Sequence, residues 1–260
     1  MAFKKLLASL GAGGASVETV LTEVNVVPGG VVQGEVRIQG GSVNQDVEGL
    51  SVGLQAKVEV ESGDEEYKQN IEFTKVRLGG AFELQAGAVH AVPFGLEIPW
   101  ETPVTMIDGQ ALRGMHIGVT TELAIARAVD SSDLDPINVH PLPVQQAILD
   151  AFIRLGFRFK NADMERGHIR GTRQQLPFYQ EIEFYPPSQY HGLNQVELSF
   201  VADGYGMDVV LEMDKKGGLF SEGSDTFRSF QVGLDDFHGT DWAAYLNQWL
   251  SEVGSRRNWF

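Results

Sequence analysis

The side chains best suited to chemistry in this chain are its histidines and a run of aspartates near its middle. Asp130, Asp133 and Asp135, with Ser132, could hold a hard cation, but the run lacks the central glycine of an EF-hand loop, and Pro141 stands where the twelfth-position glutamate would be. No two histidines have the spacing of metal ligands on one strand or helix. The six are His90, His116, His140, His168, His191 and His238. The sequence therefore predicts no metal site and no cofactor.

Short catalytic motifs are also absent. The chain contains no Gly-x-x-x-x-Gly-Lys-Ser/Thr phosphate loop, no His-Glu-x-x-His pair and no Gly-x-Ser-x-Gly nucleophile turn. It has no cysteine, which excludes disulfides, thiolate metal ligands and thiol catalysis. We therefore predict no catalytic residues and a protein that is not an enzyme.

Composition and charge narrow the class of partner. The chain has 260 residues, of which 43% are hydrophobic and 21% charged, as in a globular protein of one or two domains. Its net charge is −15, and neither half has an excess of basic residues. This charge disfavours binding to nucleic acid and to anionic lipid. No apolar run reaches the length of a membrane span, and the lack of cysteine fits a cytoplasmic location.

A turn followed by a strand is the clearest structural signal. Pro28 presets one turn dihedral, and Gly29 and Gly30 permit the positive φ values that a reversal of the chain needs. Gly34, at the start of the next strand, predicts a bulge or a close backbone approach. Apolar residues then alternate with polar ones as far as Ile38.

The same alternation recurs along most of the chain. Residues 50–60 form the longest run, with every second side chain apolar, and predict a half-buried strand. An Asp-Gly turn at 203–204 predicts a hairpin between two later runs. Further strands are predicted at 92–98, 117–125, 157–159, 178–184, 196–200 and 207–213. Short strands joined by turns favour antiparallel β-sandwiches.

Helical spacing is confined to a few segments. Apolar residues spaced three and four apart predict a linker helix at 144–155 and a C-terminal helix at 241–253, with Thr240 as the N-cap. The aromatic face of the second helix is expected to cover a core, although it could also bind a partner. A short amphipathic helix is predicted at 2–10, either docked, touching a membrane surface or part of a cleaved signal.

The amino-acid composition changes over residues 130–143, and this change predicts a domain boundary. It is rich in aspartate and proline, and is therefore too stiff for a freely jointed linker. We predict an N-terminal domain over 1–135 and a C-terminal domain over 136–260. The predicted interdomain hinge comprises Asp130, Asp133, Asp135, Pro136, Pro141 and Pro143.

Two small groups near the C-terminus are candidates for contact with a partner protein. The first is a basic, glycine-rich loop after a strand, for which an ordinary turn is the preferred interpretation. The second is an aromatic pair that could also be a frayed end. Their residues are Lys215, Lys216, Leu219 and Phe220 in the loop, and Trp259 and Phe260 at the end.

Several stretches together resemble known families. Residues 28–36, PGGVVQGEV, and 92–99, VPFGLEIP, look like two signatures of arrestin-like domains. Residues 3–9, 39–43 and 145–158 are similar to the bacterial sporulation-control family called SpoOM. The resemblance covers most of residues 1–220. It implies two tandem arrestin-like β-sandwiches and a cytoplasmic, non-enzymatic regulator of developmental or stationary-phase physiology, with no catalytic residues to transfer.

The leading functional hypothesis is accordingly a regulatory adaptor or scaffold that acts through protein–protein interaction. One alternative is a β-sandwich module that binds a small ligand or carbohydrate, for which Trp100 is the side chain of interest. The other is a β-sandwich hydrolase, which would need two carboxylates about 5–10 Å apart in a cleft.

Overall fold

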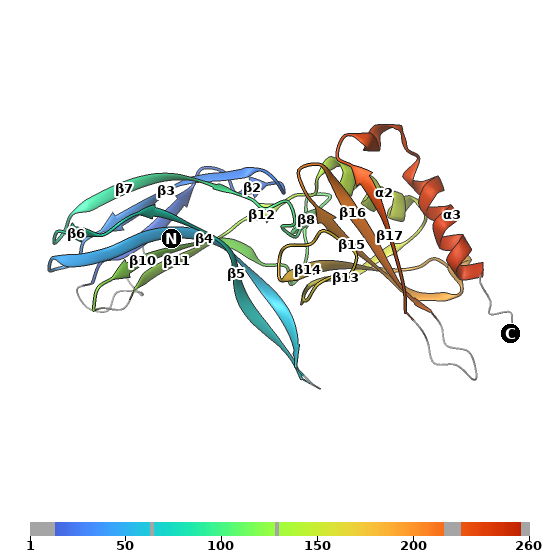
Figure 1. The fold of residues 1–260 in the computed structure, drawn as a ribbon, viewed down its shortest axis with the longest axis horizontal. Helices are drawn as coiled ribbons and strands as arrows, with labels where there is room; N and C mark the ends of the chain where they lie inside the picture. Colours follow the sequence, from blue (N-terminus) through green and yellow to red (C-terminus); the bar gives the residue numbers. More distant parts are fainter. Residues whose placement is uncertain (1–13, 63–64, 128–129, 216–224, 256–260) are drawn as a thin grey trace. The chain divides into compact units, whose positions relative to one another are not determined.

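The computed structural model describes residues 14–62, 65–127, 130–215 and 225–255, and shows a mainly β protein (Figure 1). The chain divides into two compact units. Unit 1 comprises residues 1–57, 70–99 and 116–139, and unit 2 comprises 58–69, 100–115 and 140–260. The predicted fold class is therefore confirmed, and each unit is described in turn.

Unit 1 is made of strands. They are β1 (Ser16–Leu21), β2 (Asn25–Val26), β3 (Val31–Gln39), β4 (Gln45–Ser62), β5 (Glu65–Gly79), β6 (Phe82–Leu84), β7 (Val89–Glu97), β10 (Ile117–Ile125), β11 (Ser131–Pro136) and β12 (Asn138–Val139). The tips of β4 and β5 belong to unit 2.

Two sheets form the sandwich of unit 1. One has the order β1-β3-β7; the other contains β11-β10-β4, with β5 and β6 also paired to β4 (Figure 1). The sheets meet at β1, where the Thr19 and Thr121 hydroxyl oxygens lie 2.6 Å apart, and where Thr19 N–H donates to Asp133 over 2.8 Å. Between them lies an apolar core that includes Val36, Leu54 and Val119, each fully buried.

The turn and strand predicted at 27–38 are confirmed. Gly29 has φ of 75°, and Gly30 N–H donates to Val27 C=O over 3.0 Å. A Cβ on Gly34 would lie 2.8 Å from the Val20 carbonyl oxygen, so this position needs glycine. The alternation predicted along 50–60 is also confirmed, since every second side chain from Leu50 to Val60 is buried.

Unit 2 combines strands with helices. Its elements are β8 (Met106–Ile107), β9 (Gln110–Ala111), α2 (Pro143–Arg154), β13 (Arg158–Arg166), β14 (Phe178–Tyr185), η1 (Ser188–Tyr190), β15 (Leu193–Ala202), β16 (Gly206–Lys215), β17 (Asp225–Gly233), η2 (Asp236–Gly239) and α3 (Trp242–Ser255). Strands β13 to β17 pair in chain order, each antiparallel to the next.

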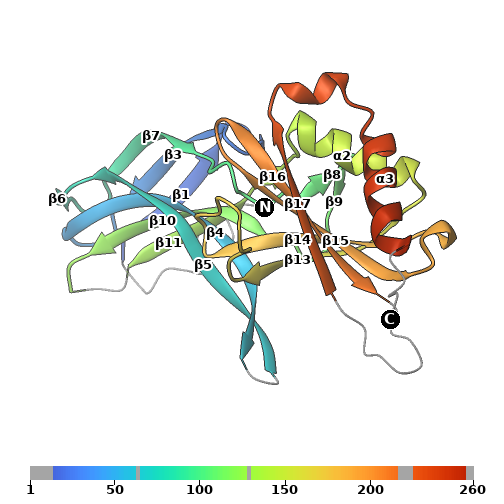
Figure 2. The ribbon, with the colours of Figure 1, turned by 45° about the vertical axis from the view of Figure 1, so that its right-hand side comes forward.

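Both helices cover the same face of this sheet (Figure 2). Phe152 of α2 stacks on Phe184 of β14, with ring centroids 4.9 Å apart. Trp242 of α3 stacks in the same way on Phe230 of β17, at 5.8 Å. Leu246 is fully buried on the same side of α3 as Trp242, so the predicted role of this helix in covering a core is confirmed. The opposite face of the sheet carries no helix among the described residues.

The structure differs from the sequence-based predictions at three places. Residues 131–136 form strand β11, paired with β10 over six residues, because their side chains alternate and the edge of β10 is available. The side-chain cap of α3 is Asp241, whose Oδ1 accepts from Ala244 N–H over 3.3 Å, and not Thr240. The chain crosses between the two units at several points, which a single boundary at 135/136 does not describe.

Two other predictions concern the ends of the chain. The helix predicted at 2–10 lies outside the described residues. Among the residues that are described, no helix is long and apolar enough to cross a membrane.

Candidate functional site

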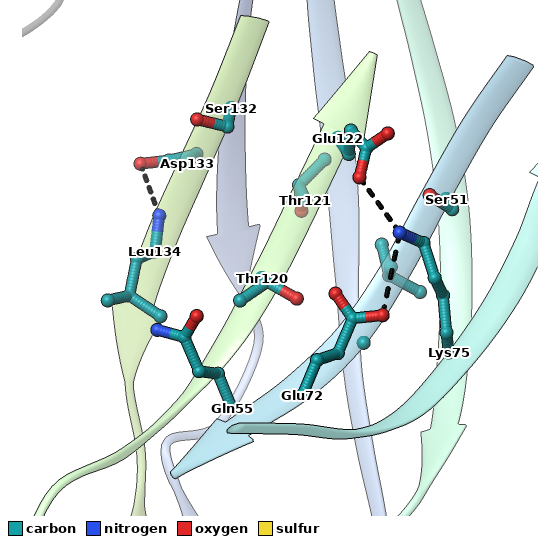
Figure 3. A pocket seen from close by; sticks show the side chains of 12 residues that line it. Ser51, Gln55, Glu72, Lys75, Thr120, Thr121, Glu122, Ser132, Asp133 and Leu134 are labelled. Carbon is teal, nitrogen blue, oxygen red and sulfur yellow. Dashed lines mark hydrogen bonds and ion pairs between the residues drawn. The ribbon is translucent and has the colours of Figure 1, made fainter. Parts of the chain in front are cut away.

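Unit 1 has a polar pocket of about 430 Å³ on the sheet that contains β4, β10 and β11 (Figure 3). Lys75 of β5 lines this pocket, with its ammonium 2.8 Å from Glu122 and 3.4 Å from Glu72. The hydrogen bond that Lys75 donates to Glu122 is the main reason that the pKa of Lys75 is raised. The remaining lining residues are Ser51, Val52, Gly53, Gln55, Thr120, Thr121, Ser132, Asp133 and Leu134.

The charged groups of this pocket serve the structure around them. Asp133 accepts hydrogen bonds from the backbone N–H groups of Thr19 and Leu134, and Thr121 is bonded to Thr19 across the sandwich. Both carboxylate oxygens of Asp133 are therefore engaged by backbone N–H groups. The pocket therefore offers a polar contact surface more readily than a reacting pair.

Unit 2 has a second and more unusual surface on the sheet face opposite to the helices. Neighbouring strands place carboxylates side by side on this face: Asp163 pairs with Glu181, Glu183 with Glu197, and Glu197 with Glu212. The tip of β4 adds Glu59, which pairs with Glu165 of β13. These carboxylates form two trios, and within each trio the carboxylate oxygens lie within 4.8 Å of one another. The trios are Glu59, Asp163 and Glu165, and Glu181, Glu197 and Glu212.

Two adjoining cavities of about 630 and 500 Å³ lie over these carboxylates and share Tyr179, Glu181 and Glu212. We call them together the acidic groove. The rest of its lining consists of Val60, Glu165, Arg166, His168, Ile169, Arg170, Glu197, Ser199, Val210, Phe227, Arg228 and Ser229.

Burial and the crowding of like charges raise the pKa values of two carboxyl groups in and beside the groove. Burial raises the pKa of Glu181 to about 8, with the charges of Glu197 and Asp163 adding to it. Burial and the charge of Glu183 raise the pKa of Asp163 to about 7. Each carboxylate makes ionisation of the next more costly, so these two groups hold protons near neutral pH.

Two lysines offset part of this charge. Lys160 contacts Glu183 and Lys68 contacts Glu59, both as ion pairs. Burial opposes the charged form of Lys160, but the hydrogen bond and charge of Glu183 outweigh it and the pKa of Lys160 is raised. Glu183 and Glu59 are therefore partly neutralised by lysine, and Glu181 lies outside these two pairs.

The arrangement favours binding over hydrolysis. A glycosidase places its two carboxylates on either side of the scissile bond. Here Glu181, Glu197 and Glu212 project from neighbouring strands of one sheet face, so they would all approach a bound group from the same side.

A third cavity, of about 290 Å³, is apolar. It lies in unit 2 beside α2 and is lined in part by Leu112, Leu149, Ile153 and Phe184. No tryptophan lines it. Trp100, singled out for carbohydrate binding, instead lies near Gly204, where an added Cβ would be 3.6 Å from the indole nitrogen.

The site residues predicted from the sequence are dispersed. Asp130 Oδ1 accepts from Ile125 N–H over 3.0 Å, while Asp133 and Asp135 lie in β11. Pro136 ends β11 and Pro143 begins α2. Pro141 lies between them, outside helix and strand. Lys215 ends β16, and the other predicted contact residues, Lys216, Leu219, Phe220, Trp259 and Phe260, lie outside the described residues.

The acidic groove was not predicted from the sequence. A signal was present, because Asp163 and Glu165, and likewise Glu181 and Glu183, are two residues apart and so share a face of one strand. Such alternation is also what any solvated strand shows. Only the pairing between strands brings the acids of four strands together.

The fold and its surfaces define a two-unit, mainly β protein of the arrestin-like kind, with open polar faces on both units. The chain belongs to the SpoOM protein family, whose model matches residues 3–217.

One curated relative and one solved structure support this assignment. The chain is 36% identical over 216 residues to the sporulation-control protein Spo0M of Bacillus subtilis strain 168, covering 82% of this chain and 81% of the relative. It matches the crystal structure of Spo0M from Bacillus subtilis with a TM-score of 0.78 and 28% identity, covering 92% of this chain and 99% of that one.

Proposed function

We propose that this protein is a regulatory adaptor in sporulation or a related stationary-phase or developmental process, and that it acts by binding other proteins. Membership of the SpoOM family carries the proposal, because the similar protein of Bacillus subtilis is named for sporulation control. The surfaces support the second part of the proposal, which is action by binding other proteins. Both units present polar side chains on a sheet face, and such faces bind proteins through side-chain complementarity.

The family and the composition also support a non-enzymatic role and a cytoplasmic location as parts of this proposal. A chain without cysteine is compatible with a reducing compartment. The alternative of a small-ligand module is less well supported, because no tryptophan is among the described residues that line the apolar cavity.

In-cell photo-crosslinking tests the adaptor role. A photoreactive amino acid replaces Gln55 in the pocket of unit 1 or Phe227 in the groove of unit 2, and Ser251 on the exposed side of α3 serves as the control position. In the native host entering stationary phase, we expect discrete cross-linked partners from at least one sheet position and none from position 251. Absence of cross-links from both sheet faces, with a deletion strain that develops normally, would contradict the proposal.

A further inference from the structure

The acidic groove of unit 2 contains acceptors that the described chain leaves unused. Ser199 lines the groove with 5% of its surface exposed, and its hydroxyl makes no hydrogen bond to a described residue. Beside the groove, Oδ1 of Asp163 is buried and has no hydrogen-bond partner. A buried polar atom without a partner costs about 1–3 kcal/mol, so the position of Asp163 Oδ1 favours a ligand that donates hydrogen bonds.

The surrounding charges favour a cationic donor. From the sheet, the groups that face Glu181 are acidic or phenolic: Asp163 and Glu165 of β13, Tyr179 and Glu183 of β14, Glu197 of β15 and Glu212 of β16. His168 and Arg170 line the larger cavity and Arg166 lines the smaller one. Glu59 and Lys68 come from the tips of β4 and β5, and Lys160 pairs with Glu183. Arg228 also lines the larger cavity, while its guanidinium carbon lies 5.9 Å from the centre of the Trp249 ring.

The chain already binds one guanidinium on this same sheet face. The Arg173 side chain donates to Asp208 over 3.2 Å and to Asp203 over 2.7 Å, and its backbone N–H also donates to Asp208. Asp208 lies two and four residues before Val210 and Glu212, which line the groove from the same strand. The face therefore has an internal example of arginine recognition by carboxylates, one from β16 and one from the turn that precedes it.

The groove also has apolar surface suited to the stem of a long basic side chain. Phe227 of β17 pairs with Glu212 and is 63% exposed, and Ile169 and Val210 lie in the same cavity. Arginine and lysine bury their methylene stems against such surface while the charged head stays polar, and a guanidinium also stacks on an aromatic ring.

We propose that the acidic groove binds an extended, arginine- or lysine-rich segment of a partner protein. Ser199 and Asp163 would accept hydrogen bonds, Glu181 and Glu212 would pair with the basic heads, and Phe227 would contact a stem. The proposal deepens the adaptor function above and rests on it. Four adjacent strands span about 14 Å, which an extended peptide covers with four or five residues.

Binding of this kind has a pH signature. Because crowding keeps Glu181 and Asp163 partly protonated near neutral pH, an arriving cation displaces protons. Affinity for the basic segment should then rise with pH between 6 and 8, by up to about tenfold per pH unit for each proton released.

The probe is a fluorescein-labelled nine-residue peptide of alternating arginine and serine, followed by fluorescence anisotropy on the full chain. Its neutral counterpart carries citrulline in place of arginine. The groove variant is Glu181→Gln with Glu212→Gln. The control variant, Glu83→Gln with Glu97→Gln, changes net charge equally at exposed positions of unit 1. Ser199→Ala tests the hydroxyl.

We expect the groove variant to weaken peptide binding at least tenfold and to lose most of the pH dependence, while the control variant stays within about twofold of wild type. Ser199→Ala should weaken binding about two- to fivefold. Equal binding of the citrulline peptide, an equal loss in the control variant, or an affinity independent of pH would overturn the proposal. Expulsion of the peptide by micromolar Ca²⁺ or by spermidine would overturn it too, because the groove would then be a site for a metal ion or a free polyamine.

The in-cell cross-linking separates this proposal from the adaptor function. If the groove variant captures the same partners as wild type, the adaptor function stands and the groove proposal fails. If wild type captures no partner yet binds the peptide, the groove chemistry stands and the adaptor function fails.

Discussion

Glu181 shows how a single residue of this protein is set by its neighbours. Nothing in the sequence distinguishes it from a solvated strand glutamate, but burial and the adjacent carboxylates raise its pKa to about 8. Asp163 is raised to about 7 for the same reasons. Their unfolded values are near 4.5 and 3.8, so the folded chain binds more protons than the unfolded chain between about pH 4 and 8. The stabilisation is present below the unfolded pKa values and is lost as pH rises through the folded ones.

Glu181→Gln should therefore flatten the pH dependence of stability. At about pH 3.5 the variant should match wild type, because Glu181 is then neutral in both the folded and the unfolded chain. At pH 8.5 it should be more stable by about 1–2 kcal/mol, a figure reduced for solvent screening. Chemical denaturation at the two pH values measures this, with Glu83→Gln as the control. A variant less stable than wild type at pH 8.5 would contradict the electrostatic account.

At the scale of elements, α3 depends on packing more than on helix propensity. Its buried face carries Trp242, Leu246 and Leu250, and the ring of Phe230 lies against it. The match to the family model ends at residue 217, so β17 and α3 lie beyond the matched segment. They nevertheless supply the last strand of the sheet in unit 2 and one of the two helices that cover it.

Leu246→Ala should destabilise the protein by about 2–5 kcal/mol, because it leaves a cavity between α3 and the sheet. Ser251→Ala, on the exposed side of the same helix, should change stability by less than about 0.5 kcal/mol. Thermal unfolding followed by tryptophan fluorescence distinguishes the two variants. Equal stability for both would show that the helix does not contribute to the core of unit 2.

At the scale of the whole molecule, we propose that the prolines at 136–143 form a stiff hinge. This hinge would couple partner binding to the angle between the two units. Proline fixes φ, so three of them restrict the paths open to this connection. The aspartates of the predicted hinge have structural contacts of their own, such as those of Asp130 and Asp133 to backbone N–H groups.

Pro136→Gly with Pro141→Gly should widen the distribution of intramolecular distances in small-angle scattering and reduce capture of cross-linked partners. Glycine adds backbone freedom at both positions. Pro186→Gly, in a loop of unit 2, is the matched control. Altered scattering with unchanged partner capture would rule out the coupling, while the adaptor function itself would be unaffected.

The sequence alone determined the local structure of this protein. Alternation along 50–60 and helical spacing at 144–155 and 241–253 depend on residues close in the chain, and the structure confirms all three. Tertiary structure decided the rest. Residues 131–136 became a strand because β10 offers an edge, and Asp163, Glu181, Glu197 and Glu212 became one surface because strand register aligns them. Register depends on the pairing between strands and on the turns that join them, so the spacing of residues within one strand does not specify it.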